Sequence, residues 1–327
     1  MANRSLIVLS DDGAAPLLGI IGAAKKSIRV KMFVFTDPLL IDALVAASHR
    51  GVKVRVMLNA ARRTGEDDNE PTRKKLLDAH ISVIDSSPKF DLTHEKSMVV
   101  DDELAVVQTL NWTTKNLTET RDYAVVTNHR HEVEEVAGCF DADWHRQHFD
   151  PGDNAHLIWC PLNGRDRIIR FIDQAKNTLF IQNERYQDTM IIEHLVHAAR
   201  QGIKVHIMAP APHKLDKAKR VEAIGNLRIL DDLKIGIRKL KGLKLHGKVI
   251  LADGKTAIIG SPNLTPGTFD TRREAAIEVS DDHVVKRLEE VVHYDWKHAH
   301  PIDLSDEGLI ADLEDPDEER RLGVHLE

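Results

Sequence analysis

The sequence predicts an α/β protein made of two similar halves, each a sheet with helices on its faces. The first observation is that the chain repeats itself at a nearly constant offset: Gly51, in the segment 50–57, is matched by Gly202, in the segment 201–208, 151 positions later. The second is that each copy alternates short apolar runs, typical of buried strands, with longer segments whose apolar residues recur at helical spacing. Order and spacing persist over about 130 residues, so the repeat is an internal duplication whose unit is the size of a domain.

The first copy reads as strand, helix and strand. A strand is predicted over 27–35, where apolar residues alternate, and a helix over 38–50. Gly51 stands where a left-handed residue would end that helix, and the next strand covers 52–58. Beyond it, the polar stretch 62–75, which contains Gly and Pro, is expected to be an exposed loop.

The second copy repeats this order, with a strand over 178–182, a helix over 189–201, Gly202 as its cap and a strand over 203–209. The polar segment 151–154, which contains Pro and Gly, separates the copies as a linker. The chain is therefore divided into a first half, a second half and a tail, which cover residues 1–150, 151–300 and 301–327.

The tail differs from the rest of the chain in charge. Residues 301–327 contain ten Asp and Glu against Arg320 and Arg321, whereas the remaining 300 residues are close to neutral. An acidic segment without aromatic residues is expected to be flexible or loosely docked. The nearly neutral body argues against a strongly basic nucleic-acid-binding protein.

Cys139 and Cys160 lack metal-binding or redox spacing and are expected to be reduced, buried thiols. The apolar run 5–9 ends at Asp11 and Asp12, too early for a signal peptide, and no stretch approaches the ~20 apolar residues of a membrane span. We therefore expect a cytoplasmic protein that meets a membrane peripherally. The sequence does not indicate an oligomeric state.

The motif H-x-K-x(4)-D occurs twice, and each copy is followed by an Asn and a carboxylate. The ten residues are His94, Lys96, Asp101, Asn111 and Asp122 in the first half, and His246, Lys248, Asp253, Asn263 and Glu274 in the second. Each motif leads into a short apolar run, 97–100 or 249–252, which predicts a buried strand with His and Lys on one face. A further strand is predicted over 105–109 and over 257–261, and the Asn follows its end, where α/β sheets place ligand groups. Two copies in register predict one active site built from both halves.

These side chains suit phosphodiester chemistry. Lys and Asn donate hydrogen bonds to the non-bridging oxygens of a phosphate. One His can attack phosphorus while the other protonates the leaving oxygen, and a carboxylate on Nδ1 leaves Nε2 free to react. Such a reaction passes through a covalent phosphohistidine and needs no metal.

The pattern resembles the signature of the phospholipase D superfamily over about residues 15–300. The segment 260–263, Gly-Ser-Pro-Asn, is similar to the family's G-[ST]-x-N segment, whereas Gln108 replaces the Gly in the first half. The resemblance implies two pseudo-symmetric α/β halves, each a mixed sheet flanked by helices, with a shared active site at their interface and no cofactor or metal.

The resemblance also implies roles. His94 is the expected nucleophile and His246 the acid and base, although the symmetry of the motifs does not by itself distinguish the two. For the other residues, Asp122 and Glu274 are expected to orient the histidines, Asp101 and Asp253 to hold the turn after the strand, and Lys96, Asn111, Lys248, Asn263, Ser261 and Thr109 to bind substrate.

Three other features leave alternatives open. The stretch 234–248 has six Lys and Arg and no acid; it is a solvated strand face, a positive approach for an anionic substrate, or a lipid contact through its Ile and Leu. Trp112 lines the pocket or packs beneath the strand, while Trp144 and Trp296 are expected in the core. Histidines near the ends of the last helix of each half are solvated or form a metal site: His145, His148, His293, His298 and His300.

We predict a phospholipase D-like phosphodiesterase that hydrolyses phospholipids or transfers phosphatidyl groups, as in the cardiolipin synthase-like branch, on phospholipid at a membrane surface. The alternative is a nuclease or other nucleic-acid phosphodiesterase that uses the same residues, which the scarcity of aromatic residues disfavours. A third alternative, a non-catalytic membrane or protein adaptor, is disfavoured by the intact motifs. The acidic tail is hypothesised to lie near 234–248 and to limit access.

Overall fold

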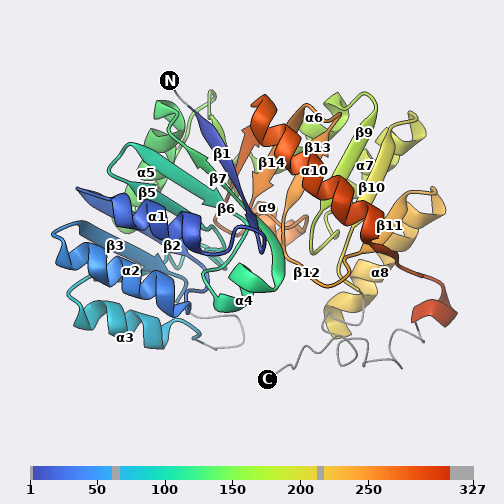
Figure 1. Ribbon diagram of the computed structural model, residues 1–327. Coiled ribbons are helices and arrows are strands. Elements are labelled where there is room, and N and C mark those ends of the chain that lie inside the picture. Colours follow the sequence, from blue (N-terminus) through green and yellow to red (C-terminus); the bar gives the residue numbers. More distant parts are fainter. Residues whose placement is uncertain (1–2, 61–66, 212–216, 310–327) are drawn as a thin grey trace.

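The structure is a computed structural model, and it describes residues 3–60, 67–211 and 217–309. Two mixed sheets of eight strands each lie side by side, with helices packed on them (Figure 1). The predicted fold class, two pseudo-symmetric α/β halves, is confirmed. The division of the chain at 150/151 and 300/301 stays a prediction.

The elements of the first half alternate between the two kinds of structure. They are β1 (Arg4–Leu9), α1 (Ala15–Ala23), β2 (Ser27–Met32), α2 (Pro38–His49), β3 (Lys53–Leu58), α3 (Glu70–Asp78), β4 (Ser82–Asp85), β5 (Ser97–Val100), β6 (Leu104–Gln108), α4 (Thr114–Thr118), β7 (Thr120–Thr127) and α5 (Arg130–Trp144).

The second half follows the same scheme. Its elements are β8 (Leu157–Cys160), α6 (Gly164–Gln174), β9 (Thr178–Gln182), α7 (Thr189–Arg200), β10 (Lys204–Met208), α8 (Lys217–Asp232), β11 (Gly236–Lys239), β12 (Lys244–Leu245), β13 (Val249–Ala252), β14 (Thr256–Gly260), α9 (Pro266–Asp270), β15 (Glu274–Val279), α10 (Asp282–His298) and β16 (His300–Pro301).

The strand order shows that the second half contributes one strand to the sheet of the first half. The first sheet runs β1-β7-β6-β5-β2-β3-β4, and β12 of the second half joins it beside β7. The second sheet runs β16-β11-β10-β9-β13-β14-β15-β8. The motif strands β5 and β13 hold equivalent central places, and both cover the residues predicted for them. Gly51 and Gly202, with φ of 89° and 86°, both lie just beyond a helix, as their spacing predicts.

An apolar core joins the halves. It takes buried side chains from β6 and β7 of the first sheet and from β14 and β15 of the second, so that Val107 and Val125 share one cluster with Ile259 and Ile277. Two further cores fill the outer faces of the two sheets. The halves therefore meet through dry packing, which fixes the groups at their boundary.

Part of the predicted exposed loop 62–75 is helical, which corrects that expectation. Helix α3 starts at Glu70, and Asn69 before it is buried, with its carboxamide bonded to the main chain at Phe33 and Phe35. The polar sequence misled because only one face of this helix, which includes Leu76, packs inward. Residues 62–66 lie outside the described residues.

The start of the acidic tail is docked on the second half. Pro301 pairs with Arg238 of β11, and Leu304 is buried in the core. The tail thus begins beside the stretch 234–248. The hypothesis that it limits access concerns mainly residues 310–327, which lie outside the described residues.

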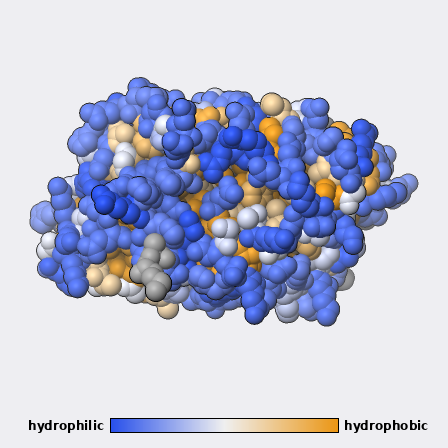
Figure 2. All heavy atoms as spheres, turned by 90° about the horizontal axis from the view of Figure 1, so that it is seen from above, coloured by the Kyte–Doolittle hydropathy of each residue, from blue (hydrophilic) through white to orange (hydrophobic). Residues whose placement is uncertain are grey.

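Within the described ranges, no helix is long and apolar enough to cross a membrane. Figure 2 shows a face of the molecule that is mostly hydrophilic, with apolar groups gathered toward its middle.

Candidate active site

Each motif histidine is bonded to a carboxylate of the other half. Nδ1 of His94 lies 2.8 Å from Oε2 of Glu274, and Nδ1 of His246 lies 2.7 Å from Oδ1 of Asp122. Both carboxylates are fully buried. A carboxylate on Nδ1 holds the ring in place and leaves Nε2 as the reactive nitrogen. The structure therefore brings these four predicted residues together, in pairs that cross the interface.

The main chain explains why the pairs cross. The amide of His94 donates to the carbonyl of Arg273 at 2.9 Å, and that of His246 donates to the carbonyl of Arg121 at 3.3 Å. Strand β12 continues the second contact by pairing with β7. Each motif thus begins beside an arginine of the other half. The carboxylate that follows this arginine in the sequence, Glu274 or Asp122, is then bonded to the motif histidine.

Two buried arginine–aspartate pairs cross the same interface. Nε and Nη2 of Arg121 contact the two carboxylate oxygens of Asp295 at 2.9 and 3.0 Å, and those of Arg273 contact Asp143, both at 3.1 Å. All four side chains are 5% exposed or less. Sequence reasoning matched Asp143 with Asp295 in the repeat but did not find their arginine partners. The available signal was the arginine that directly precedes the motif carboxylate in each half, Arg121 before Asp122 and Arg273 before Glu274.

Asp122 is held by hydroxyl and amide donors of its own half. Oγ1 of Thr109 donates to Oδ1 at 2.5 Å, Oγ1 of Thr120 donates to Oδ2 at 2.5 Å, and Nδ2 of Asn116 donates to Oδ2 at 3.1 Å. These bonds leave the carboxylate one main direction for a further partner, which is the imidazole.

Thr109 and Ser261 are fully buried and are bonded within the protein. Neither side chain has exposed surface. Thr109 is bonded to its carboxylate, and Oγ of Ser261 donates to the carbonyl and accepts from the amide of Ala275. That these two residues bind substrate stays a prediction; in this structure both are bonded within the layer behind the histidines.

The two histidine–carboxylate pairs differ in their electrostatic surroundings. Burial lowers the pKa of His94 well below its usual value, and the ammonium groups of Lys96 and Lys248 lower it further. Burial raises the pKa of Glu274 to about 7 and lowers that of Lys96 to about 7. For Asp122, burial acts upward, but the partner histidine and Lys248 outweigh it and the pKa lies below its usual value.

The predicted phosphate donors surround the histidines. Nζ of Lys96 and of Lys248 each donates to the carbonyl of its own motif histidine, which holds the ammonium groups beside the rings. The side-chain oxygens of Asn111 and Asn263 are buried and have no partner within the described part of the chain. Both oxygens are acceptors, so they are suited to a ligand that donates a hydrogen bond to them, while donation to a phosphate would use the side-chain nitrogens.

The symmetry of the site also breaks beside the two histidines. Phe33 packs edge-on to His94, with ring centroids 4.9 Å apart, and stands at 5.2 Å from Nζ of Lys96. At the equivalent place 151 residues later stands Glu184, whose Oε2 lies 2.6 Å from Nζ of Lys248 and 3.9 Å from Nε2 of His246.

Sequence reasoning missed Glu184. Burial alone would raise the pKa of this carboxyl, but Lys248 and then His246 outweigh it and lower the pKa to about 2, so Glu184 is negatively charged. The available signal was the repeat itself, because alignment at the offset of 151 sets an acid against Phe33.

Asp101 and Asp253 lie at the opposite ends of the motif strands from the histidines. Asp101 accepts from the amides of residues 25–27, and Asp253 from those of residues 176–178. Both have positive φ, 57° and 55°, in the turn after the strand. The structure therefore removes these two motif residues from the set that can touch substrate, and their contacts fit the turn-holding role.

One buried group has the composition of a metal site among the described residues, formed by Glu95, Cys139 and Asp143. Nζ of Lys31 contacts all three, at 2.8, 3.4 and 2.7 Å, so an ammonium takes the central place. These residues fit a buried ion-pair network better than a metal. The histidines near the helix ends belong to no such group and are exposed: His145, His148, His293, His298 and His300.

Three apolar residues of the stretch 234–248 face inward, whereas Leu240 and Leu243 are half-buried. Ile235, Ile237 and Leu245 are buried, which removes them as lipid contacts. The stretch forms β11 and β12, and β12 delivers His246 to the site.

Of the tryptophans, Trp112 is buried and donates to Oε1 of Gln108, so it packs beneath the strand. Trp144 and Trp296 are only partly buried, which corrects their placement in the core. The aspartates that directly precede these two tryptophans, Asp143 and Asp295, form the buried pairs with arginine across the interface.

The chain is similar in sequence to known proteins of one family. A family described as "Cardiolipin synthase, PLD-like domain" matches the chain twice, over residues 17–144 and 168–296. Cardiolipin synthase B of Salmonella typhimurium is 25% identical over 302 residues, which cover 80% of this chain and 72% of that protein. A polyphosphate kinase of Vibrio parahaemolyticus is 25% identical over 82% of this chain but only 40% of its own length.

Two solved structures share the fold over most of this chain. Phosphatidylserine synthase of Haemophilus influenzae has a TM-score of 0.75 and 11% identity, with 98% of this chain and 93% of that chain covered. Polyphosphate kinase of Porphyromonas gingivalis has a TM-score of 0.67 and 15% identity over 90% of this chain, which spans 50% of that chain.

Proposed function

The chain belongs to the phospholipase D-like family of cardiolipin synthase, and from this membership we propose that it cleaves or transfers phosphatidyl groups of phospholipids at a membrane surface. It is an enzyme of the phospholipase D superfamily, a phosphodiesterase or phosphatidyltransferase. The proposal of a lipid substrate rests on the family and on the cardiolipin synthase and phosphatidylserine synthase relatives.

The proposed reaction has two steps. Nε2 of His94 attacks the phosphorus, the bond from phosphorus to the leaving oxygen breaks, and His246 gives that oxygen a proton. His246 then takes a proton from water or an alcohol, which attacks the phosphohistidine and releases His94. Lys96, Lys248 and the two motif asparagines hold the non-bridging oxygens in both steps. No metal is assigned a part.

The observation that carries the role assignment is the contrast between Phe33 and Glu184. His94 lies against an aromatic ring and its pKa is lowered by burial and by two ammonium groups, so it is neutral and its Nε2 lone pair is available. His246 has Asp122 on Nδ1 and Glu184 near Nε2, so it stands between two carboxylates where His94 has one and an aromatic ring.

The test is to incubate the protein with EDTA and vesicles of phosphatidylglycerol or phosphatidylcholine, or with single- and double-stranded DNA, beside His94→Ala. We expect lipid turnover that persists in EDTA and is lost in the variant. Turnover of DNA without lipid would instead identify a nuclease, and turnover of none of these would refute the proposal. Labelled phosphate trapped on His94 supports its role as nucleophile, whereas label on His246 reverses the two roles.

A further inference from the structure

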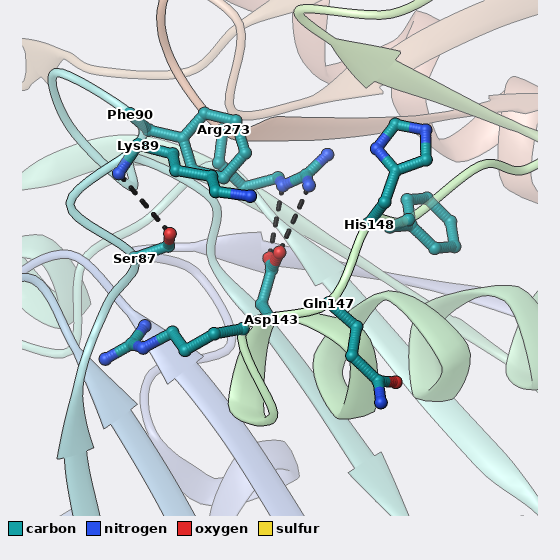
Figure 3. Close-up of a pocket in the computed structure, with 9 residues that line it drawn as sticks. Ser87, Lys89, Phe90, Asp143, Gln147, His148 and Arg273 are labelled. Carbon is teal, nitrogen blue, oxygen red and sulfur yellow. Dashed lines mark hydrogen bonds and ion pairs between the residues drawn. The ribbon is translucent and has the colours of Figure 1, made fainter.

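A cavity of about 50 Å³ lies beside the Arg273–Asp143 pair (Figure 3). Its walls include Lys89, Arg146 and His148, and none of the ten motif residues lines it. Because one water needs about 10–15 Å³ of such space, the cavity has room for roughly three or four waters or for one phosphate-sized oxyanion.

One donor at this cavity is unused. The guanidinium of Arg273 bonds Asp143 through Nε and Nη2, while Nη1 is buried and has no partner among residues 3–60, 67–211 and 217–309. Figure 3 shows this third nitrogen turned away from Asp143. The whole side chain is only 3% exposed. A buried arginine donor without an acceptor is costly, and an anion is the acceptor that suits it best.

The other half shows what an arginine in this position binds. Arg121 is the counterpart of Arg273, and its Nη1 contacts Oδ1 of Asp11 at 2.9 Å and the carbonyl of Leu9 at 3.2 Å. At the offset of 151, Asp11 corresponds to Leu162, which is exposed and has no carboxylate. The chain therefore supplies an anion to one arginine and leaves a cavity beside the other.

The charges around the cavity favour an anion. Asp143 is the one acid in its walls, and its charge is already matched by Arg273 and by Lys31 behind it. Lys89 and Arg146 add two cations, and Lys89 forms no ion pair within the described ranges. In Figure 3 the Lys89 side chain extends toward the Arg273 guanidinium.

We propose that this cavity binds a phosphate group, with Nη1 of Arg273 and Nζ of Lys89 as its donors. The phosphate is either free in solution or part of a lipid headgroup. The carbonyl of Arg273 accepts from the amides of His94 and Glu95, so an occupant that fixes Arg273 also steadies the start of the first motif. The site does not depend on the proposed lipid reaction, because phosphate binding and lipid turnover are measured separately.

The test is a calorimetric titration of the full chain with inorganic phosphate at constant ionic strength. We expect two binding events, one at the motif site and one at the cavity. Lys89→Ala should weaken one event about 10-fold or more, while Asn263→Ala should weaken the other. Lys74→Ala, at an exposed lysine away from the cavity, is the matched control and should change neither. A single event that Asn263→Ala removes and Lys89→Ala leaves intact would overturn the proposal.

A second variant tests the site by filling it. Ser87→Asp places a carboxylate in the cavity wall, as Asp11 does for Arg121. It should raise the Tm without phosphate and reduce the phosphate-dependent rise seen in the wild type to the part that is due to the motif site. A phosphate-dependent rise that survives Ser87→Asp unchanged would count against the site.

Vesicles distinguish the two sources of phosphate. If the ligand is a lipid headgroup, Lys89→Ala should weaken binding to phosphatidylglycerol vesicles severalfold relative to Lys74→Ala. If only the response to inorganic phosphate changes, the ligand is the free ion. Both results support the site, whereas no change in either assay refutes it.

Discussion

Replacing Asp143 by Asn should destabilise the protein more than the equivalent change at Asp295. Asp143 faces two buried cations: burial acts to raise its pKa, but Lys31 and Arg273 outweigh this and lower the pKa below its usual value. For Asp295, burial raises the pKa and Arg121 offsets this only in part. The two aspartates thus occupy equivalent positions but differ in how well the folded protein stabilises their charge.

The size of the effect follows from the partners left behind. Removing one member of a buried ion pair costs about 3–5 kcal/mol, because the remaining charge is uncompensated. At about 2 °C per kcal/mol for a chain of this size, Asp143→Asn should lower the Tm by roughly 6–10 °C. After Asp295→Asn, Arg121 keeps Asp11, so less than half of that loss is expected.

The effect should also depend on pH. The folded-state pKa of Asp143 is lowered, so its contribution is present above the unfolded-state pKa and disappears as the pH falls through the lower folded value. The gap in Tm between wild type and Asp143→Asn should therefore be full at pH 7 and should close below about pH 4.

Scanning calorimetry of wild type, Asp143→Asn and Asp295→Asn at pH 7 and in the acid range measures this. Glu103→Gln is the control, because its pair with Lys26 leaves both side chains 70% exposed and should not change the Tm. Equal losses for the two aspartate variants, or a loss at Asp143 no larger than that of the control, would refute the reasoning.

Three further outcomes are expected. Glu184→Gln should lower kcat for lipid turnover about 10-fold or more, because His246 loses a neighbouring negative charge, whereas Phe33→Leu at the equivalent position should change kcat by less than about threefold. The value of kcat/KM should fall as the pH rises through about 7, where Lys96 loses its charge, and Lys96→Arg should move that fall to higher pH. Gly260→Ala should greatly reduce the yield of folded protein, since its Cβ would lie 2.4 Å from the neighbouring strand, whereas Gly138→Ala, with nothing within 4 Å, should fold normally and gain up to about 1 kcal/mol of stability.

Most of the fold was predictable because it depends on local periodicity and on a visible repeat. The strands β5, β9 and β13 coincide with short apolar runs, and both helix-ending glycines follow from their positions. The prediction of a loop over 62–75 was wrong because a helix that buries only one face and has few apolar residues has the composition of a loop. Composition records how many residues are apolar but not how they are distributed around a helix.

The sequence predicted which residues form the site, but not which of them are bonded to one another. The motif residues His94, His246 and their carboxylates do come together, yet nothing in a linear repeat shows that each histidine takes the acid of the other half. For His246 this exchange arises from the pairing of β12 with β7, and for His94 from the bridge between Thr93 and Arg273, both of which join segments more than 100 residues apart. Nearness in sequence to a ligand group also does not show that Thr109 is bonded to the carboxylate of Asp122.

A duplicated site gives its two histidines fixed roles only if it loses part of its symmetry. The proposed first step needs one neutral imidazole to attack and one protonated imidazole to donate, at the same moment and in the same pocket. With identical surroundings, the two rings would have the same proton affinity, so that either could attack and either could donate. The lowered pKa of His94 keeps that ring neutral before substrate arrives, and the two surroundings differ by an aromatic ring beside His94 and a carboxylate beside His246. The double variant Phe33→Glu with Glu184→Phe should therefore shift the covalent label from His94 toward His246, and a label that stays on His94 would show that the roles are fixed elsewhere.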